Sequence, residues 1–335
     1  MDYFEDDLFD SLTKGNLKSL KEYLDKGLDV NHAFRSNDRP DRLGQTLIEV
    51  ALKSDQKKVA KLLVDRKCNA NLKYIVNVVN YTYILQRYAK KDGLKLTCMY
   101  PAIVKGDVET IKLLVLGGFD VNIHDDRGCT ALWHAVDLRN YDMVKAILAA
   151  EKCDVNVSDT AMLRPLHIAS MHGNNRIASL LIRRGAIVDC VQLRGWTPLL
   201  LACRAGSEAT VKLLLLNGAD PNHIGKNEHT ALSMSLQYVE NRIVAEMLLE
   251  AGACVDQHLI KRCKEEKFQA LIANPDMFSV LKSCSETPRT LRAFCCLTIR
   301  KALLQSRPDV HLVMKVEKLP LPKLIKDFLL LGHLI

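Results

Sequence analysis

Cysteine and histidine are the residue types in this chain that could bind a metal or serve as nucleophile and base. The chain has eleven Cys and ten His among 335 residues, and no two Cys form a CxxC pair. Zinc sites group thiolate and imidazole ligands at short spacings, and disulfide frameworks are typical of short secreted chains. Because neither pattern is present, the sequence predicts no metal site and no disulfides, with most thiols buried in a reducing compartment.

The strongest candidates for chemistry each lack a neighbour that the chemistry requires. His172 lies five residues after His167 but has no Cys or Glu at ligand spacing. Cys295 has no acid–base partner that the sequence places beside it. No Gly-rich phosphate loop follows a strand pattern. We therefore predict no catalytic residue and no cofactor, expect that the protein is not an enzyme, and favour structural roles for His134 and His167.

The helix predicted around Cys295 has the pattern of a binding element. Thr287 can cap it and Pro288 suits its first turn. Leu291, Cys295 and Ile299 recur every four residues, so they form one stripe. Other apolar residues lie on further faces of this helix: Phe294, Leu297 and Leu304. A short helix that is apolar on several faces needs a neighbour in its own chain and a partner outside it.

Two segments of the last 48 residues carry a family resemblance. The run Thr290-Leu291-x-x-x-Cys295-x-x-x-Ile299 resembles the elongin-binding box of a SOCS box. Downstream, Leu319-Pro320-Leu321-Pro322 resembles its cullin box. The resemblance implies a small three-helix SOCS box over residues 288–335. Its elongin C contacts would be Thr290, Leu291, Cys295 and Ile299, and its cullin-5 contacts would be Leu319, Pro320, Leu321 and Pro322. The alternative is a C-terminal helical hairpin that only caps the fold.

Composition and charge limit the class of protein. The chain is 48% hydrophobic and long enough for two domains. Its start, MDYFEDDLF, is acidic where a secretory signal is basic and then apolar, and no run of about 18 apolar residues occurs. Residues 288–335 hold nine Lys and Arg against three Asp and Glu, which is +6 of the net charge of +8. We therefore predict an intracellular protein, in the cytoplasm with the nucleus as an alternative, that contacts neither membrane nor nucleic acid.

Residues 1–257 are dominated by an internal repeat. Segments similar to G-A-D-V-N occur seven times, ending at residues 31, 71, 122, 156, 189, 222 and 256. Segments similar to T-P-L-H stand between them, beginning at Thr130, Arg164, Thr197 and Thr230. A helical hairpin of this length cannot bury its apolar face alone, so neighbouring copies must stack.

This pattern resembles the ankyrin repeat, which implies an all-α solenoid of helix-turn-helix units joined by hairpin turns. We expect seven repeats over residues 1–257, a helical cap over residues 258–287 and the SOCS box after it. The family also uses His at the start of repeat helices for hydrogen bonds between repeats, which is the role expected for His134 and His167.

Departures from the repeat pattern carry more information than the pattern itself. Asp55 and Met162 stand where a helix-ending or turn Gly is expected. Extra residues fall in 33–43 and 72–93, and the second insertion is rich in Tyr, including Tyr81 and Tyr83. Because Tyr is favoured at interfaces, we hypothesise that this insertion holds a target protein. A packed extra helix and a loop without a partner are the alternatives.

The variable turn positions predict a recognition face. Ankyrin domains tend to direct side chains at these positions toward a partner, and here the residues are Arg127, Arg194, Trp196 and His229. The alternative is a solvated rim.

Together the two resemblances imply a substrate-recognition subunit of a cullin–RING ubiquitin ligase, with elongin B, elongin C, cullin-5 and a RING protein as partners. The target protein stays unidentified. A plain ankyrin scaffold is the second hypothesis.

Overall fold

The computed structural model describes most of the repeat region and a small part of the C-terminal region. The described residues are 2–34, 45–68, 74–76, 94–96, 99–238, 242–265 and 275–286, with residues 316, 318, 323 and 326. They divide into two compact units, Met1–Thr160 (unit 1) and Ala161–Ile335 (unit 2), which are treated separately below.

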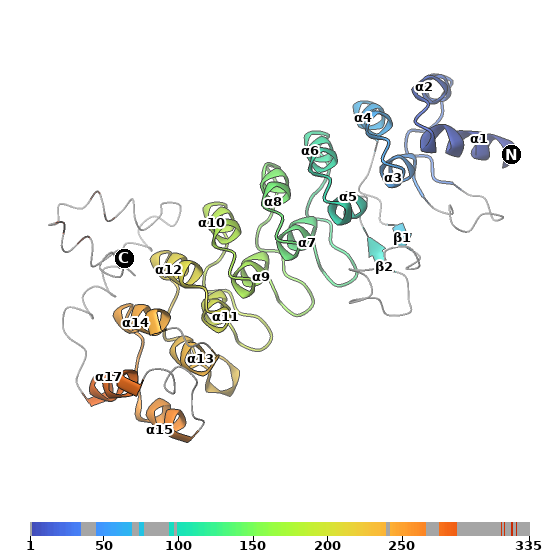
Figure 1. Cartoon of the computed structure of the whole chain (residues 1–335). Helices are drawn as coiled ribbons and strands as arrows, with labels where there is room; N and C mark the ends of the chain where they lie inside the picture. Colours follow the sequence, from blue (N-terminus) through green and yellow to red (C-terminus); the bar gives the residue numbers. More distant parts are fainter. Residues whose placement is uncertain are drawn as a thin grey trace. The chain divides into compact units, whose positions relative to one another are not determined.

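Unit 1 contains four pairs of helices in two layers (Figure 1). The first helices, α1, α3, α5 and α7, contact one another in sequence, and among the second helices α4 contacts α6 and α6 contacts α8. The bounds are α1 Asp2–Thr13, α2 Leu17–Asp25, α3 Leu47–Lys53, α4 Lys57–Asp65, α5 Tyr100–Lys105, α6 Val108–Leu116, α7 Ala131–Asp137 and α8 Tyr141–Leu148.

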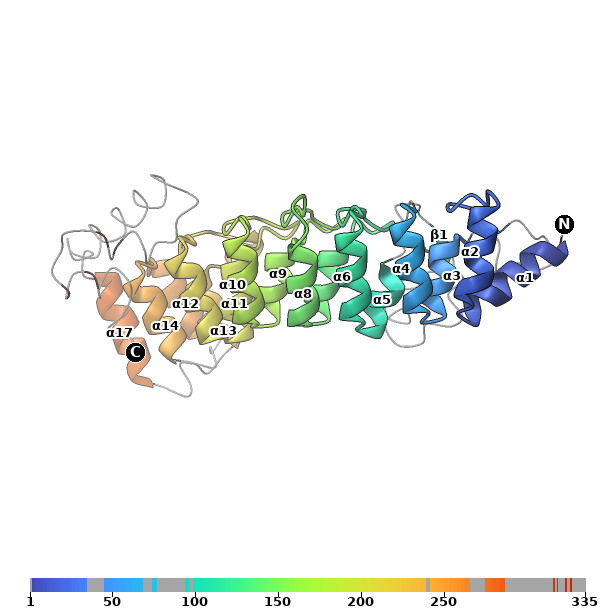
Figure 2. The same ribbon diagram turned by 90° about the horizontal axis from the view of Figure 1, so that it is seen from above.

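Unit 2 repeats the plan with three pairs and a helical end. The first helices α9, α11 and α13 pack in a row, and the second helices α10, α12 and α14 lie side by side in a second layer, in front of the first in Figure 2. Helices α15 and α17 contact each other after the last pair. The bounds are α9 Pro165–Met171, α10 Asn175–Arg183, α11 Pro198–Ala205, α12 Glu208–Leu216, a 3-10 turn Lys226–Glu228, α13 Ala231–Tyr238, α14 Arg242–Glu250, α15 Gln257–Glu265 and α17 Pro275–Glu286.

The pair α11 and α12 shows why the repeated sequence motif folds into two helices. Thr197 caps α11 by accepting the N–H of Leu200, and Pro198 fills the first turn, where its missing N–H leaves nothing unsatisfied. Gly206 ends the helix at φ 69°, the left-handed conformation that Gly adopts without a Cβ clash. The apolar side chains between these ends are buried: Leu199, Leu200, Leu201 and Ala202. The expected helical repeat is confirmed by this geometry.

The Asp and Asn of the D-V-N segments each have a hydrogen-bonding role. The Asp side chain accepts the N–H two residues later, as Asp120 does from Asn122 at 2.9 Å. The Asn then joins the next repeat: Asn122 donates to the carbonyl of Lys152 at 2.7 Å and accepts the N–H of Asp154 at 2.8 Å. In unit 2, Asp189 occupies the Asn position and accepts the N–H of Asp220. The motif is therefore a clamp between consecutive repeats.

Two residues that replace an expected Gly adopt the left-handed backbone conformation that Gly favours. Asp55 has φ 57° and Met162 has φ 60°. An L residue with a Cβ is strained in this region, Asp less than Met, so both positions store a small strain.

The insertion after α4 contains an element that the sequence did not predict. Two short strands, β1 Tyr74–Val76 and β2 Leu94–Leu96, pair antiparallel with Ile75 opposite Lys95. The otherwise helical fold of the described residues thus includes a two-stranded sheet here. Tyr81 and Tyr83, proposed for target binding, lie outside the described residues, as does most of the insertion 33–43.

No helix in the described part of the chain combines the length and the apolar character needed to cross a membrane.

Candidate target-binding surface

Trp196 lies half-buried at the end of the turn that precedes α11. The turn is closed by the Gln192 N–H, which donates to the Trp196 carbonyl at 3.2 Å, and Gly195 takes φ 72° within it. Leu193, at the tip of the turn, is 53% exposed. A large aromatic ring and an exposed apolar side chain therefore share one short turn.

The preceding repeat fixes the backbone of Trp196 through His167. The Nε2 atom of His167 lies 3.1 Å from the Cys190 carbonyl oxygen and 3.2 Å from that of Trp196. Both oxygens are acceptors, so Nε2 carries the proton, and Nδ1 accepts the N–H of Arg164 at 3.1 Å. Burial lowers the pKa of His167 to about 4, since charging the ring would require hydration that the site does not offer. His167 is thus a neutral structural His between repeats, as expected.

The following repeat fixes the Trp196 ring. Gly225 stands against it so closely that a Cβ there would lie 2.8 Å from the Trp196 Cδ1 atom. The His229 ring meets the Trp196 ring edge-on with centroids 6.0 Å apart. From the end of α11, the guanidinium of Arg204 lies 5.4 Å from the centroid of the Trp196 ring, a cation–π contact. The indole is therefore held in one position before any partner arrives.

The structure brings together only part of the predicted recognition face. Trp196 and His229 are in contact, and Arg194 joins them through its carbonyl, which accepts the Lys226 N–H at 3.2 Å. Arg127 belongs to unit 1, where it is partly buried with its guanidinium 5.9 Å from the Trp133 centroid. The sequence did not predict Arg204 as a member of this face. Arg204 follows Trp196 at the far end of α11, and no local sequence pattern signals their contact.

Unit 1 contains a buried group of possible metal ligands that the sequence did not predict. Asp125, Cys129 and His134 place one ligand atom each within 4.8 Å of one another. The Asp125 carboxylate already accepts the N–H groups of Arg127 and Cys129, both at 2.9 Å, and lies 3.1 Å from the His134 Nε2 atom. Burial raises the pKa of the Cys129 thiol to about 12, whereas a metal ligand is a thiolate. The group therefore fits a structural role in the turn.

The role expected for His134 needs a correction. Its hydrogen bond to Asp125 lies within its own repeat, since Asp125 begins the turn that leads into α7. His134 therefore does not join two repeats through this bond. The T-P-L-H register explains the difference, because Trp133 occupies the His position and His134 is the residue after it.

Glu49 is a buried ionisable residue that the sequence pattern did not single out. It is 1% exposed, and its Oε2 atom accepts the Thr46 N–H at 2.8 Å at the start of α3. Burial raises the pKa of Glu49 to about 7, although the Thr46 hydrogen bond and the charge of Lys53 oppose the shift.

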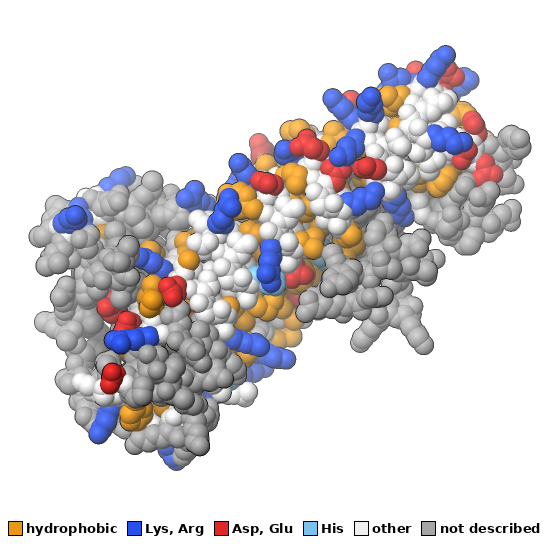
Figure 3. All heavy atoms as spheres, in the orientation of Figure 1, with side chains coloured by type: hydrophobic (Ala, Val, Ile, Leu, Met, Phe, Trp, Pro, Cys, Tyr) orange, Lys and Arg blue, Asp and Glu red, His pale blue; other side chains and the backbone are white. Residues whose placement is uncertain are grey.

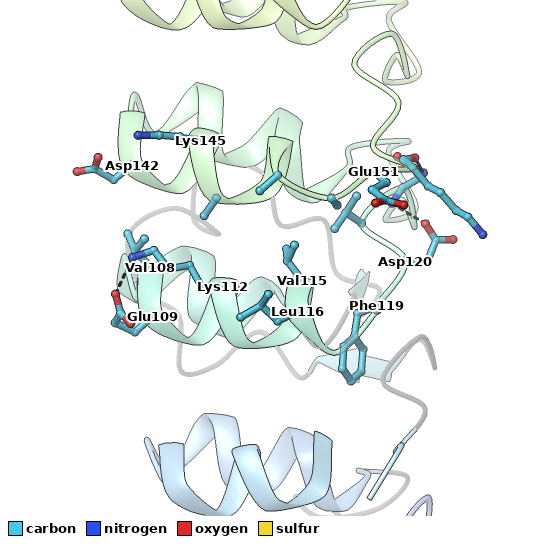
Figure 4. A pocket seen from close by; sticks show the side chains of 17 residues that line it. Val108, Glu109, Lys112, Val115, Leu116, Phe119, Asp120, Asp142, Lys145 and Glu151 are labelled. Atoms are coloured by element: carbon cyan, nitrogen blue, oxygen red, sulfur yellow. Dashed lines mark hydrogen bonds and ion pairs between the residues drawn. The ribbon is translucent and has the colours of Figure 1, made fainter. Parts of the chain in front are cut away.

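A groove of about 1320 Å³ runs between α6 and α8 in unit 1 (Figure 4). Leu116 on its α6 wall is 86% exposed, and the α8 wall includes Ala146. Charged residues of both signs line it, among them Lys112 and Asp142. Such a groove between neighbouring helices offers contact area but no group of catalytic side chains among the residues that line it.

The SOCS-box residues predicted to bind elongin C and cullin lie outside the described residues. The ankyrin repeat model matches residues 72–159 and 161–258, more than half of the chain. The chain belongs to the ankyrin repeat family. The SOCS box model matches residues 287–330, so this ankyrin repeat protein also carries a SOCS box.

Curated relatives share the repeats. The ankyrin repeat protein YahD of Escherichia coli is 27% identical over 45% of this chain and 78% of its own length. The ankyrin repeat protein nuc-2 of Neurospora crassa is 26% identical over 63% of this chain and 18% of its own. The human SH3 and multiple ankyrin repeat domains protein 2 is 30% identical over 54% of this chain and 10% of its own. The matches thus span less than a fifth of the latter two proteins.

Proposed function

We propose that this protein is the substrate-recognition subunit of an elongin–cullin–RING ubiquitin ligase, of the cullin-5 type. The observation that carries the proposal is the SOCS box match at residues 287–330, which follows the ankyrin repeats in the same chain. Within the proposal, residues 1–257 bind the target, residues 258–287 form a helical cap, and residues 288–335 dock on the ligase. Helices α15 and α17 support the assignment of the cap.

The proposed mechanism is proximity. The repeats hold a target so that one of its lysines stays at a high effective concentration near the ubiquitin-conjugating enzyme. Bond formation then belongs to other subunits.

The elongin contact is assigned to Leu291 and Cys295, with Thr290 and Ile299 in support. Leu291 and Cys295 lie four residues apart, so a helix presents them on one face as an apolar pair. An apolar pair that enters a pocket loses its binding when a charge is introduced, since the charge must be desolvated.

Co-purification with elongin C tests the proposal. Wild-type protein is expected to bring down elongin B and elongin C, and Leu291→Asp and Cys295→Asp are expected to abolish this. Leu116→Asp is the matched control, because Leu116 is 86% exposed on α6, so a carboxylate introduced there stays in contact with water. Failure of the wild type to bind elongin C, or intact binding by Leu291→Asp, would leave a plain ankyrin scaffold as the better description.

The cullin contact is tested separately. Pro320→Ala with Pro322→Ala is expected to weaken cullin-5 binding while elongin C binding persists. Binding of cullin-2 in place of cullin-5 by the wild type would contradict the cullin-5 assignment. The proposed compartment is the cytoplasm, with the nucleus as an alternative, and imaging of the tagged full chain tests it.

A further inference from the structure

In unit 2, the turns before α11 and α13 and the end of α11 carry cations around the Trp196 ring. Arg194, Arg204 and Lys226 are exposed, and Trp196 and His229 lie between them half-buried. A hydrogen bond from the Lys226 N–H to the Arg194 carbonyl joins the two turns, and Arg204 lies over the Trp196 ring. We name these five residues the tryptophan surface.

Two cations of the tryptophan surface, Arg194 and Lys226, form no ion pair with an Asp or Glu side chain among the described residues. The acidic side chain of these turns, Glu228, lies 3.3 Å from His258. Arg262 adds a further cation near the same turn, where its guanidinium donates to the Glu228 carbonyl at 3.5 Å. The local charge is therefore positive, although residues 1–287 together are nearly neutral.

The corresponding turn of unit 1 lacks this character. Asp126 is exposed there, Asp125 is buried in the turn, and Arg127 is partly buried beside Trp133. A positive surface is thus a property of particular turns and does not follow from the repeat pattern.

We propose that the tryptophan surface binds an acidic segment of the target protein that also carries an apolar residue. Arg side chains recognise carboxylates through paired, charge-assisted hydrogen bonds. Trp and Arg are the residues that most often dominate protein interfaces, and a side chain already held in place loses little freedom on binding. Exposed Leu193 beside Trp196 supplies apolar contact. Figure 3 shows Lys and Arg side chains beside apolar ones at the place that the loops before α11 and α13 occupy in Figure 1.

A protein segment fits this surface better than a nucleic acid. Proteins that bind single strands stack bases on open aromatic faces along a basic groove. Here Arg204 lies over the Trp196 ring, and His229 and Gly225 border it. The inference rests on the proposed function, because it names the chemistry of the target that the ligase subunit would hold.

A selection from displayed random 15-residue peptides on the full chain tests the inference. The enriched peptides are expected to carry net negative charge with at least one large apolar residue. The best of them, labelled with fluorescein, is expected to bind on the order of tenfold more weakly when its Glu and Asp are replaced by Gln and Asn. Neutral or basic enriched peptides, or no enrichment, would overturn the inference.

Variants locate the site. Arg194→Glu and Arg204→Glu are each expected to weaken the labelled peptide on the order of tenfold, through loss of a charge-assisted contact and like-charge repulsion. Arg183→Glu is the matched control, because Arg183 is exposed on α10 of the same unit, and it is expected to change binding by less than about twofold. Equal weakening by Arg183→Glu would overturn the assignment. So would displacement of the peptide by a uridine oligonucleotide that binds more tightly.

Trp196→Phe keeps an aromatic ring, so it is the variant to use at this position if a smaller side chain there prevents folding. It is expected to weaken peptide binding less than Arg204→Glu does. Elongin C binding by Arg194→Glu separates the two proposals. Lost peptide binding with intact elongin C binding supports both, whereas peptide binding without elongin C in the wild type rejects only the ligase function.

Discussion

Helices α3 in unit 1 and α9 in unit 2 begin with the same hydrogen bond made by different chemistry. In α3, the Glu49 carboxylate accepts the Thr46 N–H, and in α9 the His167 Nδ1 atom accepts the Arg164 N–H. Both side chains are buried, but burial raises the pKa of Glu49 to about 7 and lowers that of His167 to about 4. One position in the repeat therefore gives the two units opposite responses to pH.

His at this position also makes hydrogen bonds to the next repeat that Glu cannot make. The second ring nitrogen of His167 reaches the Cys190 and Trp196 carbonyls of the next repeat. An ionised carboxylate has no proton to donate to a carbonyl. His167 thus supports the turn that holds Trp196 as well as its own helix.

The two Trp residues of the chain allow each unit to be followed separately. Trp133 lies in unit 1 and Trp196 in unit 2. Trp196→Phe therefore leaves a fluorescence reporter in unit 1, and Trp133→Phe leaves one in unit 2.

Removal of His167 is the largest expected effect. His167→Ala leaves the Arg164 N–H and the Cys190 carbonyl without their partner in a buried site, and the Trp196 carbonyl keeps only the Gln192 N–H. Unit 2 is therefore expected to lose roughly 3 kcal/mol of unfolding free energy. Urea unfolding followed by Trp196 fluorescence measures this. His172→Ala is the control, since His172 is only half-buried at the end of α9, and a loss of similar size there would show that His167 has no special role.

The opposite pH responses are expected to be almost as large. The pKa of His167 is lower in the folded state than its ordinary value of 6.5, so its contribution is present above pH 6.5 and is lost as the pH falls toward 4. The pKa of Glu49 is raised above 4.5, so its contribution is present below pH 4.5 and is lost as the pH rises through about 7. Each change is roughly 3 kcal/mol over its window, and urea unfolding of each unit across that pH range measures it.

Glu49→Gln isolates the effect of ionisation at this position, because Gln can still accept the Thr46 N–H and does not ionise. The variant is expected to stabilise unit 1 above pH 7 and to change it little near pH 4.5, as measured by Trp133 fluorescence. An equal effect at both pH values would contradict a raised pKa.

Crowding at Trp196 gives a smaller expected effect. Gly225→Ala places a Cβ 2.8 Å from the Trp196 Cδ1 atom, so the ring or the turn must shift. We expect a loss of about 1–2 kcal/mol in unit 2 with a changed emission of Trp196. Gly27→Ala in unit 1 is the comparison variant, because its new Cβ has no atom within 4 Å while its backbone lies at φ 96°. Gly27→Ala therefore measures backbone strain alone, and Gly225→Ala measures the steric effect.

Relief of backbone strain is the smallest expected effect. Met162→Gly is expected to stabilise unit 2 by about 1 kcal/mol, because Met is strained at φ 60°. Asp55→Gly is expected to gain less in unit 1, since Asp tolerates this conformation better. Urea unfolding of both variants checks the order, and a loss of stability in Met162→Gly would contradict strain there.

Features that repeat with the register could be predicted from the sequence, whereas contacts between distant residues could not. The left-handed backbone at Asp55 and Met162 followed from their place in the repeat. The position of Arg204 over Trp196 and the strands β1 and β2 depend on packing that no single repeat encodes. Net charge summed over long segments likewise did not reveal the cations that lie close together in unit 2.

The clamp made by Asn122 has a consequence for how such a chain can lengthen. Asn222 makes the same two bonds in unit 2, to the Gly252 carbonyl at 3.0 Å and from the Cys254 N–H at 2.7 Å. Each of these two repeats thus offers the next one an identical donor and acceptor. A whole module could be duplicated or removed between two such residues with both clamps still matched, so the length of the array can vary in evolution while its internal bonding stays the same.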